Sequence, residues 1–265
     1  MPRPDHGIDP VGDTGKPARG GKEAVMNVFD RLRKAFRSMI EENSWESEQV
    51  SVRARALSPQ EAIGNPEHRD YPLIKGRERM MQAEFGGSLG QAFTDDYGDF
   101  WGSISEVAAL TLTDNFQRAV FLATLNAAAR RLGLVTRTIH CTDDRPPLCA
   151  QELAAHVTSR FGLPRIAMLG LQPRMVEALA ARFELRVTDL DEENIGREKF
   201  GVTVGGPDET ARNLAWCDIV LATGTVLTND TYRELAAHKP TIFYGVTVAA
   251  AAHLLCVERF CPYGS

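Results

Sequence analysis

The segment Arg165-Ile-Ala-Met-Leu-Gly170 is a short apolar run that ends in glycine, which is typical of a strand buried on both faces of a parallel sheet. Three further strand-like runs lie at residues 185–189, 218–224 and 241–245, of which the last two also end in glycine. Helical stretches of about ten residues separate them, and such alternation is typical of βαβ units. Residues 164–265 are therefore predicted to form a Rossmann-like α/β domain around a parallel sheet.

The first half of the chain has a different order of expected elements. Apolar residues recur at helical spacing over residues 22–42, and an alternating stretch at 49–57 is typical of a half-buried strand. Gly86-Gly87-Ser88 between two strand-like runs indicates a hairpin, and a longer helix is expected over residues 115–131. These elements together predict a smaller α+β domain over residues 22–132.

The remaining segments are expected to be a tail and a connection. Residues 1–21 contain no apolar stretch of the kind that a secretory signal needs, and they are predicted to be a disordered tail. Residues 133–163 are expected to connect the two domains, with a helix at residues 148–160. The chain is thus predicted to consist of two domains.

The overall composition excludes several classes of protein. A net charge of -5 argues against a general nucleic-acid-binding protein, which normally carries a basic surplus. No run of about 18 apolar residues occurs, so no membrane span is expected. Five cysteines form no recognisable disulfide pattern, which indicates a reducing, cytoplasmic setting. The sequence is compatible with a homo-oligomer and indicates neither a nucleic-acid nor a membrane partner.

A ligand of an open parallel sheet lies beyond the carboxyl ends of the strands. Here the predicted strands end at Gly170, Asp189, Gly224 and Gly245, and glycine allows a ligand to approach the backbone closely. Asp189 follows Gly170 by 19 residues, which is close to the spacing at which an acidic side chain binds a ribose hydroxyl. The alternative is that Asp189 caps the turn expected at residues 192–197.

The residues after Gly170 disfavour NAD as the ligand, because the second and third glycines of the dinucleotide fingerprint are missing. The segment from Thr223 to Thr231 indicates a different kind of ligand. It places hydroxyls and amides, among them Thr225 and Asn229, at a strand-to-helix turn whose N–H groups favour an anion. The alternative is plain N-capping. A small anionic or nucleoside-like ligand is therefore predicted.

The segment Thr138-Ile-His-Cys-Thr-Asp-Asp-Arg-Pro-Pro-Leu-Cys-Ala150 contains residues that bind metals. Imidazole and thiolate ligands from His140, Cys141 and Cys149 suit zinc, iron or copper, although their spacing matches no standard site. Cys149 is expected near the start of a helix, where N–H groups would lower the pKa of its thiol. The alternative is that these residues pack beneath the junction of the domains.

Acidic and aromatic residues gather at residues 93–101, directly after the predicted hairpin. Asp95 and Asp96 in this stretch are candidates for one wall of a cleft between the two domains. An ordinary surface loop is an equal alternative.

Several runs together resemble the family named "putative heavy-metal chelation", over residues 25–265. The resemblance implies an enolase N-terminal-like domain followed by a Rossmann-like domain, with a site between them. It implies no established reaction, and enolase activity does not transfer, because the barrel that carries enolase's catalytic residues is absent. The runs are Tyr71-Pro-Leu-Ile-Lys-Gly, Gly90-Gln-Ala-Phe-Thr-Asp, Arg118-Ala-Val-Phe, Thr138-Ile-His-Cys, Thr188-Asp-Leu-Asp-Glu-Glu-Asn-Ile-Gly and Thr223-Gly-Thr-Val-Leu-Thr-Asn-Asp-Thr.

Three functional hypotheses follow, and the sequence does not decide whether the protein is an enzyme. The first is a metal-handling protein that uses His140, Cys141 and either Cys149 or Asp95. The second is an enzyme that acts on a small anionic or nucleoside-like ligand bound at the strand ends. The third is a carrier or sensor that binds the same ligand without converting it.

Overall fold

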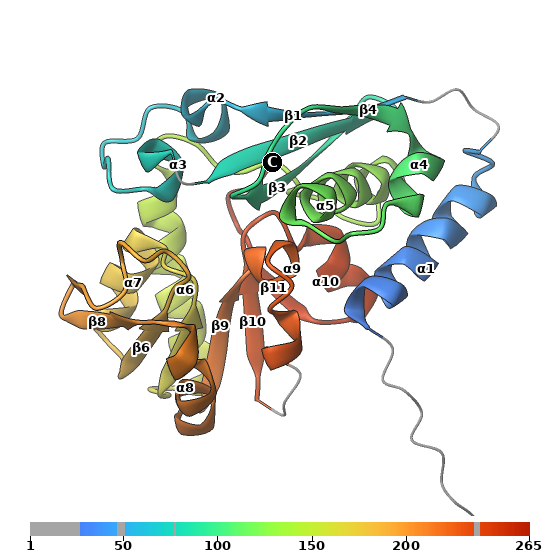
Figure 1. Cartoon of the computed structure of the whole chain (residues 1–265). Coiled ribbons are helices and arrows are strands. Elements are labelled where there is room, and N and C mark those ends of the chain that lie inside the picture. The colour runs from blue at the N-terminus through green and yellow to red at the C-terminus, as the bar shows by residue number, and fades with distance from the viewer. Residues whose placement is uncertain (1–26, 47–50, 77, 236–238) are drawn as a thin grey trace, which may run out of the picture.

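The computed structural model describes residues 27–46, 51–76, 78–235 and 239–265. These residues form one four-stranded sheet and one seven-stranded sheet, with helices around both (Figure 1). This mixed α/β architecture, with a parallel sheet and a separate antiparallel sheet, confirms the predicted fold class. The predicted tail lies outside the described residues.

The four-stranded sheet is antiparallel throughout. Its hairpin turns at Gly86 and Gly87, whose φ angles of 55° and 78° lie in the left-handed region that glycine tolerates best. The predicted hairpin is therefore confirmed. In the order β3-β2-β1-β4, the sheet consists of strands β1 (Ser51–Leu57), β2 (Arg79–Phe85), β3 (Ser88–Thr94) and β4 (Phe100–Ser103).

A helix of 17 residues, α5 (Asn115–Arg131), packs across one face of this sheet and begins at Asp114, whose carboxylate accepts the Gln117 N–H. Figure 1 shows α5 between the two sheets. The approach of α5 to the sheet is close at Gly90 of β3, where a side chain would meet the backbone of the helix. The other helices of this half are α1 (Val28–Glu42), α2 (Pro59–Ile63), α3 (Pro72–Lys75) and α4 (Ile104–Ala109).

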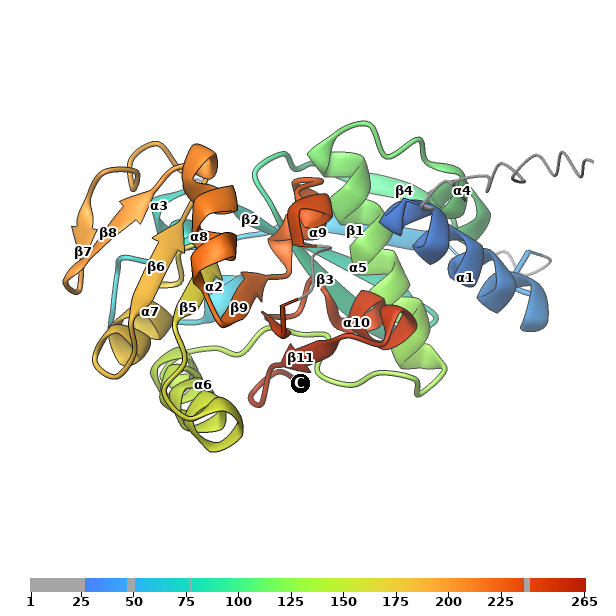
Figure 2. The same ribbon diagram turned by 90° about the horizontal axis from the view of Figure 1, so that it is seen from below.

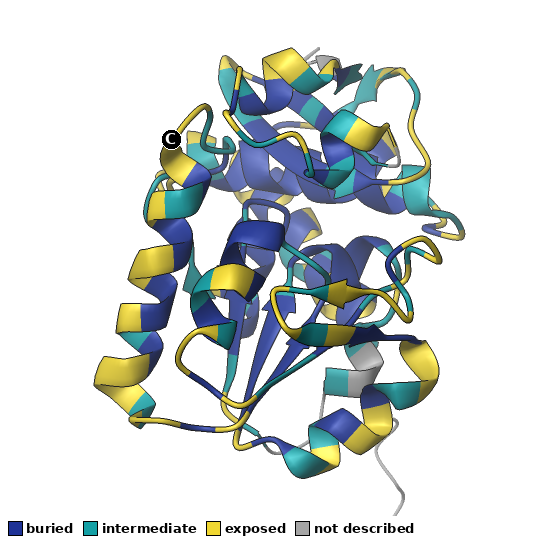
Figure 3. Ribbon diagram, turned by 90° about the vertical axis from the view of Figure 1, so that its left-hand side faces the viewer, coloured by how far each residue is buried: buried dark blue, intermediate teal, exposed yellow. Residues whose placement is uncertain are grey.

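The seven-stranded sheet is parallel except for its edge strand β7, which pairs antiparallel with β8. Its central strands are buried on both faces, as the continuous apolar runs predict (Figure 3). Its order is β11-β10-β9-β5-β6-β8-β7. The strands are β5 (Ile166–Leu169), β6 (Leu185–Thr188), β7 (Glu198–Lys199), β8 (Val202–Gly205), β9 (Ile219–Thr223), β10 (Thr241–Tyr244) and β11 (Glu258–Phe260).

Helices cover both faces of this sheet (Figure 2). Two of them, α6 (Arg145–Phe161) and α7 (Pro173–Ala180), pack on one face. On the other face, α10 (Ala249–Leu255) joins α5 and α1 in one continuous apolar core that includes residues of both sheets. The remaining short helices are η1 (Pro207–Glu209), α8 (Thr210–Trp216), α9 (Thr225–Thr228) and η2 (Tyr232–Leu235).

Hydrogen bonds between the two halves supplement this shared core. The Asn126 side chain donates to the carbonyl oxygens of Val246 and Thr247, and the Phe93 N–H donates to the Thr247 hydroxyl at 3.0 Å. An ion pair of 2.7 Å joins Arg174 of α7 to Asp70, which precedes α3. The domain boundaries placed at residues 132 and 164 from the sequence stay a prediction.

Three elements differ from those predicted. Helix α6 begins at Arg145, three residues before the predicted start, because its prolines occupy the first turn, where a missing N–H costs nothing. The stretch between the strand-like runs at 218–224 and 241–245, expected to be one helix, contains the short helix α9 and the 3-10 turn η2, and its residues 236–238 lie outside the described residues. The C-terminal segment adds the edge strand β11 to the sheet. None of the helices within the described residues is long and apolar enough to cross a membrane.

Candidate functional site

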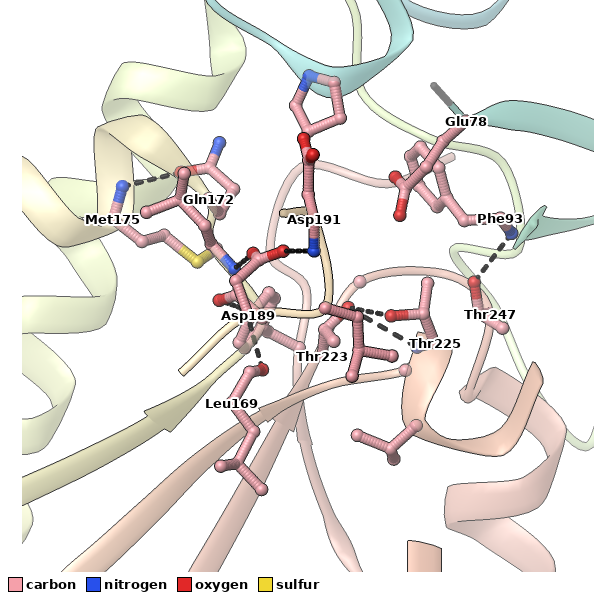
Figure 4. Close-up of a pocket in the computed structure, with 18 of the residues that line it drawn as sticks. Glu78, Phe93, Leu169, Gln172, Met175, Asp189, Asp191, Thr223, Thr225 and Thr247 are labelled. Carbon is pink, nitrogen blue, oxygen red and sulfur yellow. Dashed lines mark hydrogen bonds between the residues drawn. The ribbon is translucent and has the colours of Figure 1, made fainter. Parts of the chain in front are cut away.

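A cavity of about 500 Å³ lies beyond the carboxyl ends of the parallel strands, beneath the edge of the antiparallel sheet (Figure 4). Loops after β5, β6, β9 and β10 form its floor, and the segments around α3, β2 and β3 contribute its other side. Parallel strands place their following loops at one edge of the sheet, which is why these residues gather there. The fold therefore forms a pocket from both halves of the chain.

The candidate ligand-binding residues surround this one cavity, with a single exception. Asp96 does not line it: its carbonyl and N–H bond the Thr94 hydroxyl, so it belongs to the turn after β3. Whether the others contact a ligand stays a prediction. The lining candidates are Gly170, Asp189, Thr223, Gly224, Thr225, Asn229, Gly245 and Asp95.

The glycines at the strand ends have structural reasons of their own. A Cβ on Gly170 would lie 2.5 Å from the Thr223 side chain, and one on Gly224 would lie 2.9 Å from the Val248 nitrogen. At these two positions glycine is required by neighbouring loops. Gly245 has a φ of 91° and open space around it, so its conformation alone favours glycine.

Asp189 connects two loops of the cavity floor. Its carboxylate accepts the N–H groups of Leu171 at 2.6 Å and Asp191 at 2.7 Å. Burial nevertheless raises the pKa of Asp189 above its usual value. In the turn whose capping was the alternative role for Asp189, the carboxylate of Asp191 accepts from the Glu193 N–H and the Asn194 amide.

The segment from Thr223 to Asn229, predicted to bind an anion, contains the four-residue helix α9, in which Thr225 and Thr228 are buried. The Thr223 hydroxyl accepts from the Thr225 hydroxyl at 3.2 Å, whereas the Thr228 hydroxyl has no partner among the described residues. Asn229 accepts a hydrogen bond from the Asn115 amide, which also donates to Asp95 at 2.6 Å. An anion site in this segment stays a prediction.

The charge of the lining gives the predicted anionic ligand no support. No lysine or arginine occurs among the described lining residues, whereas five carboxylates do. A negatively charged ligand would meet like charges in a partly desolvated site. The carboxylates are Glu78, Asp95, Asp189, Asp191 and Glu192.

Glu78 was not found by reasoning from the sequence, because no motif surrounds it and a charged residue before a strand is ordinary. It precedes β2, and its carboxylate points into the cavity (Figure 4). Burial raises the pKa of Glu78 from 4.5 to about 7, and repulsion from Asp189, Asp95 and Asp191 adds to the effect. Near neutral pH this carboxyl is thus divided between its two protonation states.

We expect Glu78→Gln to stabilise the ligand-free protein at pH 8 by about 2 kcal/mol and to have little effect at pH 5. Because the folded state holds the Glu78 proton more tightly, the free energy of unfolding of the wild type should fall between pH 4.5 and about 7 and then level off. Urea denaturation at several pH values measures this. Glu42→Gln, at an exposed residue of α1, is the control. If the free energy of unfolding depended on pH in the same way in both variants, the expectation would be contradicted.

Two polar atoms at the cavity are buried without a partner among the described residues: the Tyr71 hydroxyl and Nδ1 of His140. Tyr71 is 6% exposed, and burial raises its pKa to about 12. Burial lowers the pKa of His140 to about 4, so this imidazole is neutral at physiological pH. Buried polar groups normally have partners, so a ligand is a natural partner for these atoms.

Tyr71→Phe should raise the free energy of unfolding of the ligand-free protein by about 1 kcal/mol, because the variant no longer buries an unpaired hydroxyl. Thermal and urea denaturation test this. Tyr97→Phe, at a tyrosine that is 45% exposed, should change little. A loss of stability in Tyr71→Phe would show that the hydroxyl has a partner in solution.

The structure brings the three metal candidates to the cavity, but not as a formed metal site. His140 packs edge-on against Phe93, with ring centroids 5.3 Å apart. Burial raises the pKa of Cys141 to about 12 and that of Cys149 still further. The lowered Cys149 pKa predicted from the sequence is therefore wrong: this side chain points from α6 into an apolar core, and desolvation outweighs the helix terminus.

The donor set does not fit a resident metal ion. Across the described part of the chain, no three His, Cys, Asp or Glu side chains come together in a way that could hold one. A third cavity thiol, Cys261 after β11, was not among the predicted ligands. It lines the same cavity as Cys141 and Cys149.

No curated protein matches the sequence significantly, whereas a family model and several solved structures do. One structure is a DUF364-family protein of unknown function from Pyrococcus horikoshii, with 14% identity, a TM-score of 0.49, and coverage of 83% of this chain and 79% of that one. Another, from Desulfitobacterium hafniense DCB-2, has 13% identity, a TM-score of 0.47, and coverage of 66% and 72%. Residues 154–257 match the model of the DUF364 family, described as "Putative heavy-metal chelation", and this confirms the predicted resemblance for that part of the chain.

Proposed function

We propose that the protein binds a small molecule in the cavity between the parallel strand ends and the antiparallel sheet. The observation that carries the proposal is the pair of unpartnered polar atoms, on Tyr71 and His140, at a cavity of about 500 Å³. Cavities of this size are typical of small-molecule sites, in which apolar walls surround a few polar groups. The lining has this character, with leucine, methionine and phenylalanine beside the carboxylates.

Binding of fragments to the wild-type protein, detected by ligand-observed NMR, tests this proposal. Leu171→Trp adds bulk to the cavity wall and should abolish binding, whereas Leu163→Trp, at a leucine that is 76% exposed outside the cavity, should leave it intact. Circular dichroism and thermal denaturation would show that both variants are folded. Binding that survives Leu171→Trp, or no binding by the wild type, would refute the proposal.

A second candidate function is the capture of a soft heavy metal as cargo. Two observations favour it: Cys141, Cys149 and Cys261 all line the cavity, and the matching family carries a heavy-metal description. Thiolates are the ligands that soft metals prefer. Since burial raises the pKa of Cys141 to about 12, capture would require release of the thiol protons and movement of the side chains.

Titration with Cd²⁺, followed by thiolate-to-cadmium charge-transfer absorption, tests the second candidate. Cys141→Ser, Cys149→Ser and Cys261→Ser should each weaken the signal, and binding should strengthen as pH rises. Cys256→Ser is the matched control, since Cys256 is exposed and lies outside the cavity lining. An equal loss of signal in the control would assign the metal to accessible thiols in general and refute this candidate.

A further inference from the structure

We propose that the ligand of this cavity is an organic cation, with a positively charged group held among the carboxylates and an apolar body against the walls. This inference rests on the proposed function, since it specifies the chemical class of the molecule that binds there. It replaces the anionic class predicted from the sequence.

The first observation is the sign of the charge around the cavity. Acidic side chains reach it from three separate segments: Glu78 before β2, Asp95 after β3, and Asp189 with Asp191 after β6. Figure 4 shows Glu78 pointing from the antiparallel sheet towards the strand ends where Asp189 lies. No lysine or arginine occurs in the described lining, so the described residues of the cavity wall do not neutralise this negative charge.

The second observation is independent of these charges. The Tyr71 hydroxyl is more than nine-tenths buried, lines the same cavity and has no partner among the described residues. A hydroxyl oxygen can accept a hydrogen bond from an ammonium or amidinium group. Tyr71 therefore supplies a neutral acceptor beside the charged ones.

The size and the apolar lining distinguish an organic cation from a bare metal ion. A metal ion would need several ligands that converge within bonding distance, and the described residues provide no such group. The cavity has room for a molecule with a ring or chain, and its apolar walls would remove that part from water. These walls include Ile63, Phe93, Leu169, Met175 and Phe260.

The protonation of Glu78 predicts how the affinity for a cation depends on pH. The charges of Asp95, Asp189 and Asp191 act on its carboxyl. The charge of Glu78 in turn contributes to the raised pKa of the Tyr244 hydroxyl. A cation bound beside Glu78 would favour the ionised carboxylate, so binding would release a proton. The affinity should therefore rise as pH increases through 7 and then reach a plateau.

The test uses probes that share one shape and differ in charge: tryptamine as the cation, tryptophol as the neutral analogue and indole-3-propionate as the anion. Further triplets built on phenyl, hydroxyphenyl and naphthyl rings extend the set. Dissociation constants are measured by NMR titration at pH 6 and pH 8. We expect the cation of a triplet to bind at least about tenfold more tightly than its anion at pH 8.

Two variants separate a charge effect from a general effect on the cavity. Glu78→Gln should reduce the preference for the cation to within about threefold and remove its dependence on pH. Glu42→Gln, at an exposed residue of α1 outside the cavity, should change neither. Asp189→Asn provides a second reduction in charge, although it also alters a hydrogen bond between loops.

The outcomes distinguish this inference from the proposed function. Equal or tighter binding of the anions or neutral analogues, lost in Leu171→Trp, would overturn the cationic class while leaving cavity binding intact. A cation preference that persists unchanged in Glu78→Gln would also overturn it. Absence of binding by every triplet would contradict both the inference and the proposed function.

Discussion

Replacing Asn126 with alanine is expected to lower the free energy of unfolding by about 4 kcal/mol. Asn126 of α5 is 1% exposed, and its amide nitrogen lies 2.9 Å from the Gln91 oxygen and 3.1 Å from the oxygens of Val246 and Thr247. Its carbonyl oxygen accepts the Ala250 N–H at 2.8 Å. Alanine would remove these hydrogen bonds at the point where the two sheets meet, and of these backbone groups only the Val246 oxygen has a further partner among the described residues, the Ala249 N–H.

Urea denaturation monitored by circular dichroism measures the effect of Asn126→Ala. Asn43→Ala removes an exposed asparagine at the end of α1, where the side chain donates to the Met39 oxygen. This variant should lower the free energy of unfolding much less. Because Asn126 bonds the loop that carries Thr247, its loss should also weaken fragment binding at the cavity. A stability loss no larger than that of the control would contradict the role given to Asn126.

Gly90→Ala is expected to destabilise the protein by about 3 kcal/mol. A Cβ on Gly90 of β3 would lie 2.3 Å from the Ala123 oxygen and 2.4 Å from the Ala127 nitrogen, both of which belong to the backbone of α5. A backbone cannot rotate away as a flexible side chain can, so the helix must move off the sheet. That movement would disturb the core that continues from α5 into the parallel sheet.

Gly98→Ala provides the comparison for Gly90→Ala. The nearest atom to a Cβ at Gly98 is a ring carbon of Phe116 at 3.4 Å, an ordinary contact, so this variant should be nearly neutral. Thermal denaturation of both variants under one set of conditions is sufficient. Equal melting temperatures would show that α5 packs less closely on β3 than the structure indicates.

The parts of the fold that the sequence predicts are those encoded locally. Each apolar run around residues 166–169, 219–223 and 241–244 ends in its own turn residues, and this pattern identifies a buried parallel strand without knowledge of its neighbours. The hairpin at Gly86 and Gly87 is encoded in the same way. The loops at the strand ends could therefore be placed near one another before the structure was known.

The parts that could not be predicted depend on contacts between distant segments. Glu78 and Tyr71 line a cavity whose floor lies more than about 90 residues further along the chain. No motif marks Glu78, and the run that begins at Tyr71 does not by itself place that side chain at the cavity. Strand β11 is recognisable only once β10 is in place beside it. In the hydroxyl-rich segment at α9, the hydrogen bond from Asn115 to Asn229 likewise depends on a residue that lies far away in sequence.

The environment of the cysteines could not be predicted from the sequence for a different reason. The position of Cys149 near a helix start suggested a lowered pKa. Its side chain instead packs in an apolar core, and this burial raises the pKa. Burial of a side chain is a property of the whole fold. Likewise, the position of Cys261 at the same cavity became evident only with the path of the C-terminal segment.

Soaking crystals of the protein with the three differently charged probes of each triplet shows directly whether the cavity binds a small organic cation between Glu78 and the parallel strand ends. We expect density for the cations in the cavity, with the charged nitrogen within hydrogen-bonding distance of Glu78, Asp95 or Asp189 and the ring against the apolar walls. Fragments bound only elsewhere on the protein, or anions bound at Glu78 in place of cations, would contradict this expectation.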